Sequence, residues 1–397
     1  MNTINKQFLS KESLFLKFPN VPLDECNIED LLVGIKSKQP YNELIDLTYY
    51  LLKNNSLSLS ELLKIWEIRL ILHLFNNQLT FSKKEAINLN NALYLNENND
   101  IAPPQGQQVQ NPNSNNDSRA SSMNSGIGNT PSPSPGLQPI YPLPKNNNGL
   151  IGHSLLIMIL RLRSIPNLSL VNELYKLCYQ LRLRSSGAEE EKVGLQLKLI
   201  NLSYDIIVIL SITKNYHTLL NYLESIRYEL VLQKKQNQLS DMYRQYLSNV
   251  TLLWVIILIM VYVRNGTKKD RLTDIITKHY QDTFENDVNE LSMNSLSYVL
   301  SHISPLPSSE EMATVPPGAL TISHLVQLIL SGDISGRIIC STIGLWDISN
   351  VHGYSLTKDD EFKLNHQPSD ASDNLSSCYN ELTSDWGRFI YKVYGLE

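Results

Sequence analysis

The chain has 397 residues, of which 42% are hydrophobic and 18% are charged, and its formal net charge is −5 at pH 7. This length is enough for two or three domains, and the apolar fraction is enough for a sizeable core. The acidic balance argues against a broad nucleic-acid-binding face, because such a face needs an excess of lysine and arginine. We therefore expect no nucleic-acid partner, although a local basic patch is compatible with these totals.

The N-terminal helical region is expected to cover residues 1–95. Apolar residues recur at spacings of three and four in "IEDLLVGIKSKQPYNELIDLTYYLLKNN", which is typical of amphipathic helices. A helix pair follows, with its turn at "NNQLTFS". Ser58 or Ser60 is the expected N-cap of the first helix, and Ser82 with Glu85 forms the expected capping box of the second.

Residues 96–149 form an Asn-, Ser- and Pro-rich tract with very few large apolar side chains. Such a tract cannot bury enough surface to offset the entropy of ordering it, so we expect a disordered linker. Its "TPSPSP" motif offers Ser/Thr-Pro steps that could accept phosphate, but a plain linker is the preferred interpretation.

Apolar helix patterns then continue over residues 150–348, and no strand pattern stands out. The second helices of the first two pairs align at an offset of 48 residues, longer than the 34 of an ideal tetratricopeptide repeat. The acidic run in "SSGAEEE" is expected to lie in a solvated loop. We predict an all-α fold: a degenerate tetratricopeptide-like solenoid interrupted by one long disordered insert, followed at 349–397 by a polar tail with a short terminal helix. The predicted helices span 150–163, 168–184, 193–213, 218–232, 240–263, 271–284, 288–303, 320–330 and 336–348.

The most apolar window, "NVTLLWVIILIMVYVR" at 249–264, raises the question of a membrane span. Its apolar run covers 250–263, whereas a spanning helix needs about 20 apolar residues. We expect a buried helix, as in the interior of a solenoid, and regard the "NVT" glycosylation motif as accidental. An integral membrane protein with spans at 199–212 and 250–263 is the alternative.

Chemistry-bearing motifs are few. The sequence contains no phosphate-binding loop, dinucleotide fingerprint, zinc-protease motif or nucleophile elbow. The four cysteines lie far apart, which predicts free thiols in a reducing compartment and no zinc site. His73 and His153 lie in apolar helices and are expected in the core or at its rim, and "SGDISGR" at 331–337 is expected to end a helix. We predict no catalytic, metal or cofactor site; an enzyme with its active site in the groove of the superhelix is the alternative.

Two groups of residues are candidates for an interaction surface. Tyrosine is apolar in its ring and polar at its tip, which suits partly exposed helix faces. A short basic loop could meet an acidic partner or lipid headgroups. The candidates are Tyr175, Tyr179, Tyr222 and Tyr228 on two predicted helices, and Arg264, Lys268, Lys269 and Arg271 on the loop.

Three stretches together resemble the family of subunit 12 of the transport protein particle (TRAPP) complex. "LLKIWEIRLILHLFNNQLTFSKKEAINLNNALY" at 62–94 is similar to the region ahead of the family's repeats, with Trp66 and Arg69 on an aliphatic helix. "GLIGHSLLIMILRLRSIPNLSLVNELYKLCYQLR" at 149–182 is similar to the next block, which carries "LRL" and then an LY-L element. "RIICSTIGLWDIS" at 337–349 is similar to the family's closing helix.

The resemblance implies a non-enzymatic subunit of a vesicle-tethering complex that acts in ER-to-Golgi transport and autophagy. The partners it implies are other TRAPP subunits and, indirectly, a Rab GTPase, with no small-molecule substrate and no cofactor. It implies a cytoplasmic protein held peripherally on ER–Golgi and Golgi membranes through the complex. The alternative is a helical-repeat adaptor of another assembly, of peroxisomal, kinetochore or proteasome-lid type.

Overall fold

Over the residues that the structure describes, the fold is all-helical apart from one small hairpin, and the prediction of an all-α protein is confirmed. The hairpin pairs two three-residue strands, β1 (Tyr354–Leu356) and β2 (Phe362–Leu364). The predicted linker lies outside the described residues, except for its first three, which continue a helix. The computed structural model describes residues 6–19, 26–54, 56–98, 151–183, 189–236, 239–303, 320–346, 354–356, 362–364, 371–384 and 386–396.

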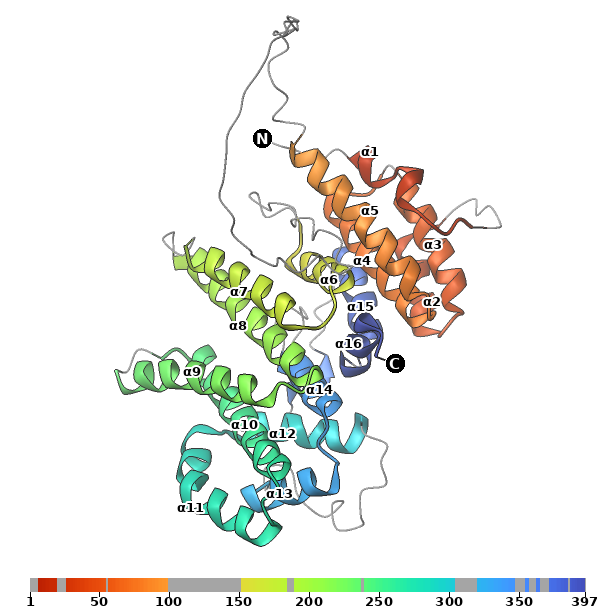
Figure 1. Ribbon diagram of the computed structural model, residues 1–397. Coiled ribbons are helices and arrows are strands. Elements are labelled where there is room, and N and C mark those ends of the chain that lie inside the picture. Colours follow the sequence, from red (N-terminus) through yellow and green to blue (C-terminus); the bar gives the residue numbers. More distant parts are fainter. Residues whose placement is uncertain are drawn as a thin grey trace, which may run out of the picture.

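Helices of the N-terminal region pack around α4, which is buried along most of its length (Figure 1). The capping box predicted at Ser58 is present: its hydroxyl accepts from the Glu61 amide, and the Glu61 carboxylate accepts from the Ser58 amide. The region consists of α1 (Lys6–Leu9), the 3₁₀ helix η1 (Glu12–Leu14), α2 (Ile28–Lys36), α3 (Tyr41–Lys53), α4 (Leu59–Phe75) and α5 (Leu79–Asn98).

The capping box predicted at Ser82 and Glu85 is wrong. Asn77 has a left-handed φ of 58° and ends the turn after α4, so α5 begins at Leu79 and Ser82 lies inside its first turn. The Ser82 hydroxyl donates to the carbonyl oxygen of Leu70 instead, at 2.9 Å. Glu85 takes part in a buried charged cluster described below.

In the middle of the chain, helices α7 to α11 pack against one another in chain order (Figure 1). The acidic run expected in a loop starts α8 instead. The helices here are α6 (His153–Arg163), α7 (Leu168–Leu183), α8 (Glu189–Ile212), α9 (Tyr216–Lys235), α10 (Asp241–Arg264) and α11 (Lys269–Asp287).

Helix α10 contains the apolar window that raised the question of a membrane span. Both α8 and α10 are long and apolar enough to cross a membrane, judged by length and composition. Both are packed inside the protein, however: 67% of the window Leu195–Ile212 and 83% of Asp241–Arg264 is buried. Asn249 of the "NVT" motif is 3% exposed and donates to the Tyr204 hydroxyl, so a glycan has no room there in the folded chain.

Helices that follow α11 pack against helices from earlier parts of the chain. α13 packs on α10 and α11, and α14 packs on α8. The predicted helix end in "SGDISGR" is confirmed, because Gly332 has a φ of 85° and caps α13. These elements are α12 (Glu290–Tyr298), the π-helix η3 (Val299–Ile303), α13 (Ile322–Ser331) and α14 (Gly336–Trp346).

The C-terminal segment carries two helices rather than one, and both belong to the core. α15 (Ala371–Leu382) packs on α2 and α4, while α16 (Trp386–Tyr394) packs on α4, α6 and α14 (Figure 1). α14 and α16 approach closely at Gly387, where an added Cβ would lie 2.9 Å from the Arg337 carbonyl oxygen. The spacing of the apolar residues in "WGRFIYKVY" explains this burial, since positions i, i+3, i+4 and i+7 place Trp386, Phe389, Ile390 and Val393 on one face of the helix.

Contacts between helices that are far apart in the sequence distinguish this fold from an open solenoid. In an open solenoid each unit contacts only its neighbours in the chain, as α7 to α11 largely do. Contacts of α14 with α8, and of α15 with α2, join helices far apart in sequence. The number and register of repeats stay a prediction.

Candidate interaction surface

The structure brings together two of the predicted tyrosines, one from α7 and one from α9. The rings of Tyr175 and Tyr222 meet edge to face, with their centroids 5.7 Å apart. Tyr175 is 40% exposed, and Tyr222 is partly buried beneath it. Burial raises the pKa of the Tyr222 hydroxyl well above its usual value, with Tyr246 as a further cause. The hydroxyl therefore stays neutral and can both donate and accept hydrogen bonds.

Tyr179 extends this face, while Tyr228 lies elsewhere. Tyr179 follows Tyr175 by one helical turn and is 63% exposed. Tyr228 is 67% exposed, but six residues along a helix from Tyr222 place it on a different side of α9. The tyrosine face therefore consists of Tyr175, Tyr179 and Tyr222.

Buried side chains hold the tyrosine face in place from behind. Leu174 and Cys178 on α7, and Leu219 and Leu223 on α9, are all buried. A buried ion pair between Arg161 of α6 and Asp205 of α8 fixes the helices beneath. Exposed tyrosines on such anchored helices lose little entropy on binding a partner, because only two side-chain torsions have to be fixed.

The predicted basic residues lie at a different place, which we call the basic link: the C-terminal end of α10, the short connection after it and the first turn of α11. Arg264, Lys268, Lys269 and Arg271 are all exposed. The Arg264 guanidinium donates to the carbonyl oxygen of Lys214 at 3.3 Å, which places the link beside the turn between α8 and α9. The tyrosine face and the basic link are thus separate features.

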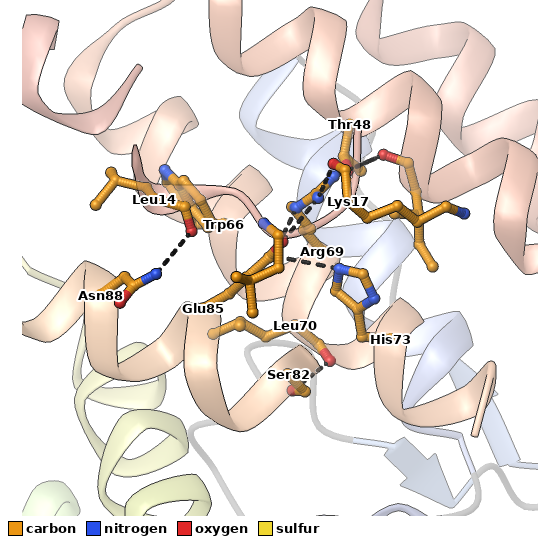
Figure 2. Close-up of polar contacts among 12 residues, drawn as sticks. Leu14, Lys17, Thr48, Trp66, Arg69, Leu70, His73, Ser82, Glu85 and Asn88 are labelled. Atoms are coloured by element: carbon orange, nitrogen blue, oxygen red, sulfur yellow. Dashed lines mark hydrogen bonds and ion pairs between the residues drawn. The ribbon is translucent and has the colours of Figure 1, made fainter. Parts of the chain in front are cut away.

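A buried charged cluster at α4 and α5 was not predicted from the sequence. The Arg69 guanidinium makes a two-pronged ion pair with Glu85, with N–O distances of 2.8 and 2.9 Å. The same guanidinium donates to the carbonyl oxygens of Lys17 and Ile45 and to the Thr48 hydroxyl (Figure 2).

Glu85 is the centre of this cluster. Its carboxylate also accepts from the Leu16 amide at 2.9 Å and lies 3.2 Å from His73 Nε2. Burial alone would raise the pKa of the carboxyl group, but its contacts with the His73 ring and the Arg69 guanidinium outweigh this effect and lower the pKa to about 2. A carboxylate with a strongly shifted pKa beside a histidine would suit an acid–base site.

The charged cluster is nevertheless closed to solvent. The side chains of Arg69, His73 and Glu85 are each 0% exposed, so no substrate reaches them in this conformation. Their partners are backbone groups of residues 16, 17 and 45, which shows a structural role: the cluster ties the N-terminal segment and α3 to α4 and α5. His73 is a core residue, as predicted, and the four cysteines are free thiols.

Within the described residues, no group of three His, Cys, Asp or Glu side chains is placed to hold a metal ion. Fold and surface together define an all-helical protein with an exposed tyrosine face and a separate basic link. No family model, curated protein or solved structure matches the chain.

Proposed function

We propose that this chain is a non-enzymatic scaffold subunit of a TRAPP-type vesicle-tethering complex, acting in ER-to-Golgi transport and autophagy. The support is the resemblance at 62–94, 149–182 and 337–349, together with the all-helical fold. In this proposal the chain binds other TRAPP subunits directly and a Rab GTPase only through them. It is cytoplasmic and reaches ER–Golgi membranes as part of the complex.

The residues that carry the resemblance are mainly packing residues. Trp66 is 0% exposed and donates its indole N–H to the Leu9 carbonyl oxygen at 3.0 Å, and Arg69 lies in the buried charged cluster. Cys340 and Thr342 of the closing helix are buried as well. The resemblance therefore supports a related helical core, and residues that bind a partner have to lie on the surface.

The observation that carries the proposal is the tyrosine face. Tyrosine is enriched at the centres of protein interfaces, where its ring is buried and its hydroxyl finds a partner. Tyr175 and Tyr179 are exposed side by side on α7, and Tyr222 of α9 supports Tyr175 from below. A scaffold needs such a rigid, partly apolar patch, and we assign the contact with neighbouring subunits to it.

The test is affinity purification of the tagged full-length chain from its own cells, with mass spectrometry of the proteins recovered. We expect TRAPP subunits in stoichiometric amounts with the native chain, and their loss with Tyr175→Ala/Tyr179→Ala. Tyr41→Ala is the matched control, since Tyr41 is 39% exposed on α3 and belongs to neither feature. Recovery of a peroxisomal, kinetochore or proteasome-lid assembly, or of no complex, would overturn the proposal.

A further inference from the structure

Five cationic side chains gather where two turns between helices lie side by side. Lys214, in the turn between α8 and α9, is exposed and has a left-handed φ of 56°. The hydrogen bond from Arg264 to the Lys214 carbonyl oxygen joins this turn to the link between α10 and α11. The link and the first turn of α11 add three further exposed cations, Lys268, Lys269 and Arg271. We call this set the basic edge: Lys214, Arg264, Lys268, Lys269 and Arg271.

No carboxylate in the described part of the chain forms an ion pair with these five side chains. Elsewhere basic residues commonly have acidic partners: Arg161 has Asp205, and both Arg227 and Lys234 have Asp287. The basic edge is therefore a local excess of positive charge on a chain whose net charge is −5.

Helix electrostatics explain only part of the basic edge. Lys214 and Arg264 lie at the C-terminal ends of α8 and α10, where a cation interacts favourably with the helix dipole. Lys268, Lys269 and Arg271 lie at the N-terminal end of α11, where the dipole opposes positive charge. Asp270 is the one acidic residue in the sequence from Lys268 to Arg271. Placing three cations there does not serve the stability of the helix, which points to a binding role.

We propose that the basic edge binds the surface of a membrane that contains anionic lipids. Its cations project from two exposed turns, which suits a broad, charged surface. An acidic peptide, in contrast, is typically recognised by a cluster of arginines that pair with its carboxylates through two hydrogen bonds, whereas three of these five cations are lysines. Tyr216 is half-buried at the start of α9 and near enough to Arg264 to interact with it electrostatically, and tyrosine favours the headgroup level of membranes. This contact is separate from the tyrosine face and independent of any TRAPP subunit.

Co-sedimentation of the purified full-length chain with vesicles tests the proposal. The vesicles consist of phosphatidylcholine alone or of phosphatidylcholine with phosphatidylserine. We expect binding only to the anionic vesicles, weakening as salt is added, because salt screens exposed charges. Each cation near an anionic surface strengthens binding about fivefold, so Lys214→Gln/Lys268→Gln/Lys269→Gln/Arg271→Gln should weaken binding by roughly 600-fold.

A matched control removes four exposed lysines from other parts of the molecule: Lys36→Gln/Lys38→Gln/Lys84→Gln/Lys235→Gln. It lowers the net charge equally and should retain most of the binding. Equal binding to both kinds of vesicle, or equal weakening in both variants, would overturn the proposal, as would binding to soluble polyglutamate but not to vesicles. Because the chain is tested alone, failure here leaves the proposed TRAPP assembly untouched.

Discussion

Replacing Glu85 by glutamine should destabilise the protein at neutral pH. In acid the same substitution should have a much smaller effect on stability. The pKa of Glu85 falls from 4.5 to about 2 on folding, so its charged form stabilises the native state above pH 4.5. That contribution is lost as the pH falls towards 2. The difference between the two pKa values corresponds to about 3 kcal/mol of unfolding free energy, and breaking a buried ion pair costs about 3–5 kcal/mol.

Urea unfolding of both proteins, followed by circular dichroism at several pH values between 7 and 2, measures this effect. The gap in unfolding free energy between the native chain and Glu85→Gln should be near 3 kcal/mol at pH 7 and should shrink steadily below pH 4.5. Glu224→Gln, at an exposed position on α9, is the control and should change little. A gap that stays constant with pH would refute the assignment of the charged carboxylate to this cluster.

Three further substitutions test the packing, each by the free energy of unfolding in urea. Arg161→Met leaves Asp205 buried without its ion partner and should cost about 3–5 kcal/mol; replacing both by apolar residues should recover much of that loss. Gly387→Val forces a side chain against Ser341 at the α14–α16 crossing and should cost about 1–3 kcal/mol, which an unchanged stability would contradict. Ser58→Ala removes the N-cap of α4 and should cost about 1 kcal/mol; no loss would show that the cap is not formed.

Helices could be predicted from the sequence because their apolar spacing, caps and turn residues act locally. The Ser58 capping box and the Gly332 helix end are of this kind. The start of α5 was misjudged, because Asn77 in a left-handed conformation ends the preceding turn early and lets the helix begin at Leu79. Of the two C-terminal helices, the short terminal one was predicted, whereas α15 was not, because most of its twelve residues are polar.

The surface was harder to predict because it depends on which helices meet. Tyr175 and Tyr222 are 47 positions apart, and only the packing of α7 beside α9 brings their rings together. The Arg69–Glu85 ion pair likewise forms only because α4 packs against α5. One signal was present in the sequence: a charged residue such as Arg69 or Asp205 within an apolar helix must find a buried partner, although the sequence does not say which.

The position of α15 and α16 has a consequence for how the protein is made. The surfaces of α2 and α4 that they cover leave the ribosome early, whereas α15 follows roughly 300 residues later, which at about 5–20 residues per second is roughly 15–60 s of synthesis. During that interval the parts of α2 and α4 that α15 and α16 cover in the folded chain lack these two partners. Transiently exposed apolar surface promotes aggregation, so slow translation of the last helices would prolong the interval in which the nascent chain can aggregate.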